Sequence, residues 1–193
     1  MPYNQNLASY PSTSPYKNSS RGRRRIPVSE RIDRVYVPLG VLEATSQVMR
    51  RFGMQQRECY VWWGGSFVAD GVAQVASAYC PDIPTDYGRI YLGVRDFHAL
   101  HRELRARDQV LIVELHTHPP GAGGQNEVDA AHPAAPYPGF LTIVVPDFAA
   151  PFLHDLRNCY VYRYIGSSDW QQLDRDQIAE KFTIEESLVM VGT

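Results

Sequence analysis

The sequence predicts one domain of mixed α+β class, in which a curved β-sheet is flanked by helices. Short runs rich in β-branched and aromatic residues alternate irregularly with two or three segments whose apolar residues recur at helical spacing. The 193 residues fit one globular domain with extensions, and a hydrophobic content of 44% is sufficient for a sizeable core.

Turn signals and apolar periodicity divide the domain into elements. Gly53 is suited to end a helix, and Gly64-Gly65 between two strand-like runs predicts the turn of a hairpin. Several prolines between residues 130 and 139 argue against regular structure there. The expected order is a strand at 35–37, a helix at 39–52, strands at 58–65 and 67–79, an irregular connection at 81–87, a helix at 95–107, strands beginning at 110, 140, 159 and 169, and a helix at 175–182.

The charge of the chain is unevenly distributed. Residues 1–31 contain six basic residues and one acidic residue, a net charge of +5 within a chain whose total is −2. This basic head lacks periodic apolar residues, so we assign residues 1–27 to a disordered tail and residues 28–193 to the folded domain. The arginine cluster at 21–25 could contact nucleic acid or an acidic partner, but a solvated tail is the simpler interpretation.

The sequence also indicates the cellular compartment of the protein. No apolar stretch approaches the roughly 18 residues that cross a bilayer, and the head lacks the apolar segment of a signal peptide. We therefore expect a cytoplasmic protein without a membrane partner. Cys59, Cys80 and Cys159 are odd in number and widely spaced, which indicates reduced and mostly buried thiols.

A candidate metal site follows the apolar run that begins at Val110. Alternate side chains of a strand share one face, so His116 and His118 should project together. Asp129 returns from beyond a loop of proline, glycine and alanine, and two nitrogens with one oxygen are the ligands of a catalytic zinc with an open fourth position. The alternative for a His-x-His pair is one histidine packed in the core and the other solvated.

The segment 116–119, His-Thr-His-Pro, resembles the JAMM motif of the MPN (Mov34/JAB) metallopeptidases. That motif places a glutamate on an earlier strand, and continues from His-x-His-Pro through six residues to Ser-x-x-Asp; here Glu58, Asn126 and Asp129 stand at the corresponding positions. The resemblance covers about residues 33–165. It implies an MPN-like curved sheet, zinc bound by the two histidines and the aspartate, and Glu58 as the catalytic acid–base. A surface acid at a strand start is the alternative interpretation of Glu58.

Two positions depart from the family's pattern. Asn126 replaces the family's serine, which helps to hold the tetrahedral intermediate, and Val61 replaces a glycine three residues after the glutamate. An asparagine amide can donate to a developing oxyanion, so we expect Asn126 to be catalytic, with an altered rate or substrate geometry. Val61 should alter packing only, since strands accept valine readily.

Two further residues could assist the site. Glu114 shares the strand face of the two histidines, so it could orient an imidazole or act as a rival base to Glu58. His132 follows Asp129 by three residues and could lie near the metal, as a loop residue or a substrate contact.

Amide hydrolysis needs each of these residue types. A zinc held by two neutral imidazoles and a carboxylate lowers the pKa of its bound water from 15.7 to roughly 7. A carboxylate with a raised pKa can take the water proton and deliver it to the leaving amine, and the asparagine amide can stabilise the oxyanion. These requirements predict a zinc-dependent hydrolase.

The family resemblance narrows this to an isopeptidase or peptidase that cleaves after the C-terminus of a ubiquitin-like modifier. Single-domain members in bacteria occur beside ubiquitin-like proteins and their activating and conjugating enzymes, in gene clusters that include antiviral defence systems. One alternative is a weakly active or inactive MPN scaffold that binds a protein partner, although such members usually lack the ligands. Another is a nucleic-acid-associated protein that uses the arginine cluster.

Overall fold

The computed structural model describes residues 32–135, 137–150, 153–167 and 169–186. The predicted disordered tail, residues 1–27, lies outside these ranges. Among the described residues, none of the helices combines the length and the apolarity that crossing a membrane requires. The elements follow in the order β1 (Arg34–Pro38), α1 (Leu39–Gly53), β2 (Tyr60–Ala69), β3 (Val72–Tyr79), β4 (Thr85–Asp86), β5 (Arg89–Ile90), α2 (Val94–Ala106), β6 (Val110–Thr117), α3 (Glu127–Ala131), β7 (Leu141–Val145), the 3₁₀ turns η1 (Asp147–Ala149) and η2 (Leu156–Asn158), β8 (Tyr160–Gly166), β9 (Asp169–Leu173), α4 (Arg175–Lys181) and β10 (Phe182–Glu185).

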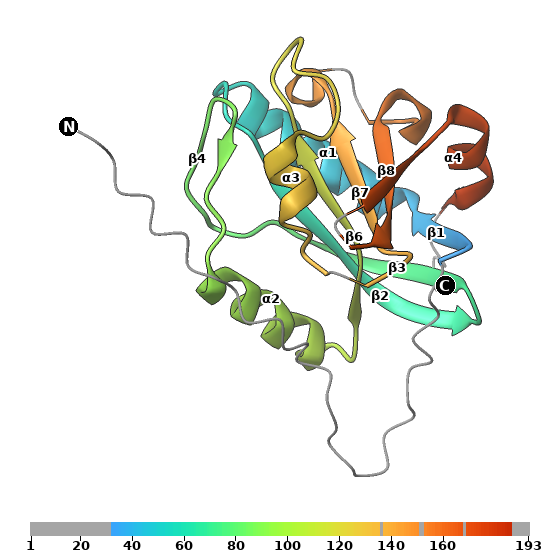
Figure 1. The fold of residues 1–193 in the computed structure, drawn as a ribbon. Helices are drawn as coiled ribbons and strands as arrows, with labels where there is room; N and C mark the ends of the chain where they lie inside the picture. The colour runs from blue at the N-terminus through green and yellow to red at the C-terminus, as the bar shows by residue number, and fades with distance from the viewer. Residues whose placement is uncertain (1–31, 136, 151–152, 168, 187–193) are drawn as a thin grey trace, which may run out of the picture.

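The sheet is mixed and curled, and helices lie on both of its faces (Figure 1). Its strands are ordered β10-β1-β3-β2-β6-β7-β8-β9, and β4 pairs with β5 separately. Strand β1 is parallel to both of its neighbours and β6 is parallel to β7, whereas the remaining neighbours are antiparallel. These features confirm the predicted α+β class with a sheet flanked by helices.

Two apolar cores hold the helices to the sheet. Helices α1 and α4 contribute Leu42 and Ile178 to the core on one face, and α2 contributes Leu100 to the core on the other. Trp62 and Trp63, adjacent on β2, are fully buried in opposite cores. Burial of each such side chain contributes about 1.5–3 kcal/mol. The central strands β2 and β6 are therefore rigid supports for residues at their ends.

The hairpin turn between β2 and β3 lies at Asp70-Gly71, so the prediction of a turn at Gly64-Gly65 is wrong. Both of these glycines lie inside β2, where the register with β3 shifts. A Cβ atom on Gly65 would lie 2.0 Å from the carbonyl oxygen of Gln74. The glycine pair permits a close strand approach, which a single sequence does not distinguish from a turn.

Two other differences concern short elements. Strand β10 follows α4 without a connecting loop, because Phe182, predicted to end that helix, is already extended and pairs with Val35 of β1. The short helix α3 occupies the start of the segment 130–139 that was expected to be irregular. Helix α3 matters for function because it carries one of the predicted ligands.

Candidate metal centre

Strand β6 carries His116 at its end, and His118 follows directly after the strand. In the register with β2, Tyr60 lies opposite His116, and the backbone of Cys59 is bonded to Thr117: Thr117 N donates to Cys59 O at 3.0 Å, and Cys59 N donates to Thr117 Oγ1 at 2.8 Å. These bonds extend the antiparallel pairing past the formal start of β2. Both imidazoles are buried, each with 3% of its residue surface exposed. Their Nε2 atoms lie 3.2 Å apart, so the two side chains project together, as predicted.

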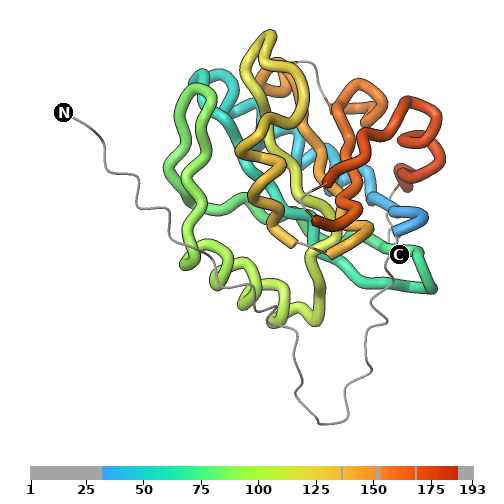
Figure 2. The backbone as a smooth tube through the Cα atoms, in the orientation of Figure 1, coloured from blue at the N-terminus to red at the C-terminus, as the bar shows by residue number. Residues whose placement is uncertain are grey.

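The chain after His118 leaves the end of β6 as a loop and returns as α3 (Figure 2). We call residues 119–126 the metal loop. A reciprocal capping box begins α3: Asn126 Oδ1 accepts from the backbone of Val128 and Asp129, while Asp129 Oδ2 accepts from Asn126 N at 2.9 Å. This box fixes the carboxylate at the first turn of the helix.

Three donor atoms converge at the end of β6. His118 Nε2 lies 3.2 Å from His116 Nε2 and 3.2 Å from Asp129 Oδ2, and His116 Nε2 lies 3.5 Å from the same oxygen. A metal held at about 2.0–2.1 Å by tetrahedral ligands keeps those ligands roughly 3.3 Å apart. The triangle therefore has the dimensions of one face of a tetrahedral site, and these three residues form a group able to hold a metal ion.

A hydrogen bond at Nδ1 leaves Nε2 of His118 available as a metal ligand. Its Nδ1 lies 3.2 Å from the carbonyl oxygen of Gly123 in the metal loop. A carbonyl can only accept, so the neutral ring carries its proton on Nδ1 and presents a lone pair at Nε2. Within the part of the chain that the structure describes, Nδ1 of His116 is buried without a hydrogen-bond partner. The ring of His116 stacks instead on Tyr60, with centroids 6.0 Å apart.

The charges of the triangle favour a cation. Burial opposes ionisation of Asp129, but hydrogen bonds from the two imidazoles and from Asn126 N outweigh it and lower the pKa of this carboxylate. Burial also opposes a charge on His118, yet the hydrogen bond to Asp129 and the nearby charges of Asp129 and Glu58 raise its pKa. Without a metal, protons shared between these donor atoms offset the negative charge. A divalent cation can take the place of those protons.

Glu58 precedes the first residue of β2 by two positions and interacts electrostatically with all three residues of the triangle. It is buried, with 6% of its residue surface exposed. Burial raises the pKa of Glu58 to about 7, although the charges of His118 and His116 act in the opposite direction. Its backbone N–H donates to Asp86 O at 3.0 Å, which ties this position to β4. The structure thus brings Glu58 into the electrostatic field of the three predicted ligands.

Glu114 lies on the same face of β6 as His116, but its carboxylate accepts hydrogen bonds from groups other than the imidazoles. One carboxylate oxygen accepts from Tyr60 Oη at 2.6 Å and from Ala134 N at 2.9 Å, and the other accepts from Thr142 Oγ1 at 2.5 Å. Burial raises the pKa of Glu114, which these hydrogen bonds oppose. Glu114 therefore anchors Tyr60, the ring that stacks on His116, without bonding an imidazole.

Asn126 and His132 lie at opposite ends of α3. Asn126 is exposed, and its side-chain oxygen is engaged in the capping box described above, so its amide group is the end that can donate to a ligand. His132 is exposed at the C-terminal end, where its Nδ1 lies 2.9 Å from Val128 O. His132 is not a member of the metal-binding group.

Sequence reasoning missed the residues that hold the metal loop and α3 in place. Gln125 N donates to Tyr162 Oη at 3.1 Å, and Trp170 Nε1 donates to Ala130 O at 2.9 Å. Gly124 makes room for this contact, because a Cβ atom there would lie 2.0 Å from Tyr162 Oη. No local pattern marks these aromatic residues on β8 and β9, whereas the capping box Asn-x-x-Asp is a visible signal for α3.

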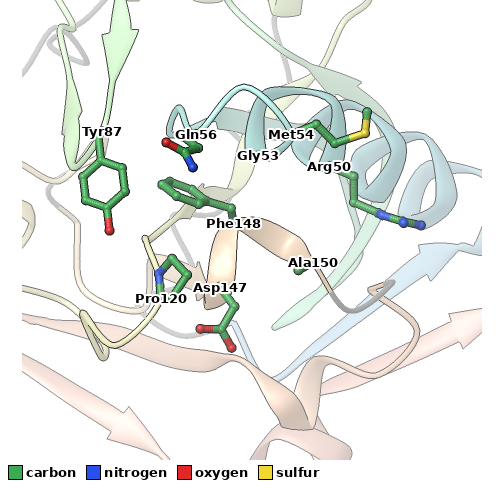
Figure 3. A pocket seen from close by; sticks show the side chains of 9 residues that line it. All are labelled: Arg50, Gly53, Met54, Gln56, Tyr87, Pro120, Asp147, Phe148 and Ala150. Carbon is green, nitrogen blue, oxygen red and sulfur yellow. The ribbon is translucent and has the colours of Figure 1, made fainter.

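A cavity of about 400 Å³ lies beside the metal loop, between the end of α1 and the turn η1 (Figure 3). Pro120, Tyr87 and Phe148 form part of its wall, and the rings of Tyr87 and Phe148 meet edge to face with centroids 5.4 Å apart. Phe148 N donates to His118 O at 2.8 Å. A backbone hydrogen bond therefore connects the wall of the cavity to His118.

The turn η1 is strained. Its three residues, 147–149, all have φ between 53° and 55°, in the left-handed region that costs non-glycine residues roughly 1–2 kcal/mol each. Gly53 of α1 permits this turn, since a Cβ atom there would lie 2.2 Å from Phe148 O. Strain of this kind concentrates at functional sites.

The chain is similar to known proteins in sequence and in fold. No family model matches the sequence. The chain is 26% identical over 160 residues to "Probable metalloprotease y4jG" of Sinorhizobium fredii, across 80% of this chain and 96% of that protein. A protein of Desulfitobacterium hafniense, whose structure was determined in solution, is similar with a TM-score of 0.57 and 15% identity, across 80% of this chain and 95% of that one. The structural likeness supports the fold alone.

Proposed function

We propose that this chain is a metal-dependent peptidase of the JAMM type, with His116, His118 and Asp129 as the metal ligands. The observation that carries the proposal is the triangle of donor atoms with sides of 3.2, 3.2 and 3.5 Å. The similarity to a protein named a probable metalloprotease supports the same reaction class. The spacing of the motif supports the narrower assignment to the JAMM type.

Zinc is the metal that this donor set suits best. Two imidazole nitrogens and one carboxylate oxygen are typical of catalytic zinc, which keeps a fourth position for water or substrate. When bound, the ion supplies a Lewis acid that acidifies water and polarises a carbonyl. The hydrogen bond between His118 Nδ1 and Gly123 O supports this role, because it leaves the opposite nitrogen free for the metal.

Glu58 acts as the general base and then as the general acid. It takes a proton from the attacking water and delivers it to the nitrogen of the leaving amine. A carboxylate whose pKa is about 7 exchanges protons in both directions near neutral pH. Glu114 is the less suitable base, because its two oxygens already accept three hydrogen bonds. The amide of Asn126 donates to the oxyanion that develops on the scissile carbonyl.

The substrate in this proposal is the bond that follows the C-terminus of a ubiquitin-like protein, in a precursor or in a conjugate of a bacterial pathway. Two segments near the site support a substrate groove. Residues 81–87 reach the candidate base through the Asp86 carbonyl, and Ala134, which follows α3, bonds Glu114. Such segments could hold an extended peptide tail by backbone hydrogen bonds.

A cleavage assay tests the reaction. The probe is a ubiquitin-like protein that carries a C-terminal reporter peptide, with the same peptide alone as the comparison. The zinc-loaded parent should cleave the fusion, Glu58→Gln should retain zinc and lose nearly all turnover, and Glu127→Gln, a change of an exposed acid on α3, should behave as the parent.

Other outcomes discriminate between the remaining functions. Equal cleavage of the free peptide would retain the peptidase and reject the ubiquitin-like substrate. Retained turnover in Glu58→Gln would move the base to Glu114 or another group. A parent that holds less than half an equivalent of zinc and cleaves nothing would favour the scaffold that only binds a partner.

A further inference from the structure

Two cysteines lie side by side, and the backbone of one of them bonds Thr117, the residue between the two histidines. Cys59 precedes β2 and Cys80 follows β3, and their sulfur atoms are 3.9 Å apart although the residues are 21 positions apart in the chain. Cys59 is completely buried, whereas Cys80 is partly exposed. The third cysteine, Cys159, is buried at the start of β8 and has no thiol partner among the described residues.

We propose that Cys59 and Cys80 form an oxidisable pair, which a peroxide converts into an intramolecular disulfide. A disulfide bond is about 2.05 Å long, so the sulfur atoms must approach by roughly 2 Å, a distance that side-chain rotation can cover. The antiparallel pairing of β2 with β3 brings the two cysteines, which flank these strands, close together. The inference concerns these thiols alone and does not depend on the peptidase proposal.

The exposure of the two thiols sets the order of the reaction. Cys80 is only partly buried and is therefore the residue that an oxidant meets first, whereas Cys59 is enclosed in the core. The hydrogen bond between the two thiols lowers the pKa of Cys80; burial opposes this effect and the guanidinium of Arg51 assists it. The pKa of Cys59 is raised by the same hydrogen bond and by burial. Cys80 is therefore the thiolate that attacks.

The chemistry balances with one peroxide molecule. The Cys80 thiolate attacks one peroxide oxygen, the O–O bond breaks, and a sulfenic acid and hydroxide form. The Cys59 sulfur then attacks the Cys80 sulfur, the S–O bond breaks, and the oxygen leaves as hydroxide while Cys59 releases its proton. The protons released by the two thiols convert the two hydroxides to water. Two thiols are thus oxidised to one disulfide, and the peroxide is reduced to two water molecules.

The position of the pair links it to neighbouring segments. Both the N–H and the carbonyl group of Cys59 bond Thr117, the residue between the two histidines. Cys80 begins the connection that leads to Asp86, whose carbonyl accepts from Glu58 N. Because Cys59 is held more firmly, Cys80 is the residue that must move. The disulfide therefore ties the segment 80–86 to the residue that precedes β2.

Peptide mapping of the full chain tests the proposal with an internal control. Trypsin cleaves after Arg57 and Arg89, so Cys59 and Cys80 fall on one peptide, and this peptide contains no methionine that peroxide could convert to a sulfoxide. Cys159 falls on a separate peptide, 158–163. The protein is treated with hydrogen peroxide in its folded state, then alkylated in denaturant and digested without reduction.

The expected result is loss of both alkylatable thiols from peptide 58–89, with a mass lower by two hydrogen atoms and full recovery after reduction. Cys159 should remain alkylated. The variant Cys80→Ser should keep a free Cys59 under the same treatment, and the matched control Cys159→Ser should form the disulfide as the parent does.

Three results would overturn the proposal. The first is a peptide 58–89 that still takes two alkyl groups when Cys159 has already reacted. The second is an oxygen added to Cys80 while Cys59 stays free. The third is a disulfide between two chains. In each case the close approach of the two sulfur atoms would not produce an internal bond.

Discussion

Replacement of Glu58 by glutamine should stabilise the metal-free protein at alkaline pH. In the folded state the pKa of Glu58 is raised from 4.5 to about 7, chiefly by burial. A group with a raised pKa in the folded state contributes its full stability below the unfolded value of 4.5. That contribution is lost as the pH rises through the interval to 7, because the buried carboxylate must then ionise. Glutamine stays neutral throughout.

The size of the effect follows from the shift. Each pKa unit corresponds to about 1.36 kcal/mol, so ionisation of Glu58 at pH 8 costs on the order of 3 kcal/mol of folding free energy. Glu58 is nearly inaccessible to solvent, so screening should reduce this value little. The difference between Glu58→Gln and the parent should therefore grow by about 3 kcal/mol between pH 4 and pH 8.

Urea denaturation of chelator-treated protein at several pH values measures this difference. The comparison of variant with parent cancels groups that titrate alike in both chains. A bound cation favours the carboxylate, so saturating zinc should shrink the difference. A difference that stays constant with pH, or that grows toward acidic pH, would refute the view that Glu58 is a desolvated acid beside the triangle.

Other changes have consequences that the contacts predict. Asn126→Ser keeps a capping oxygen, so stability should change by less than about 0.5 kcal/mol and the cleavage rate should stay level or rise; a large loss of rate would show that the amide is essential. Glu114→Ala leaves the buried hydroxyl of Tyr60 and the partly buried N–H of Ala134 unpaired, and should destabilise the fold by about 2–4 kcal/mol in urea denaturation, whereas a neutral result would contradict the anchoring role. Gly65→Ala should lower the melting temperature, since its Cβ would lie 2.0 Å from a carbonyl oxygen; an unchanged melting temperature would mean that the strands can separate without cost.

Much of the candidate site could be predicted from sequence because its geometry is local. Strand periodicity alone places His116 and His118 on one face, and the structure has them so. The fold class was predicted because segments with apolar residues at helical spacing alternate with short strand-like runs. The identity of Asp129 as the third donor depended on motif spacing, and the capping box that orients it could have been recognised beside that spacing.

The remaining features depend on contacts between distant segments, which no local pattern records. Gly64-Gly65 has the composition of a turn, but a close approach of β3 requires it within a strand. Tyr162, which holds the metal loop, lies 37 residues from its partner Gln125. The adjacency of Cys59 and Cys80 likewise arises only when β2 pairs with β3. The sequence therefore predicted which three donor residues converge, but it did not predict the residues that support them.

The zinc content of purified protein tests the central claim most directly. Protein prepared without chelator and dialysed against low zinc should retain about one equivalent per chain, and Asp129→Ala under the same treatment should retain almost none. A parent with less than half an equivalent, or a variant that holds as much zinc as the parent, would contradict a metal centre built from His116, His118 and Asp129.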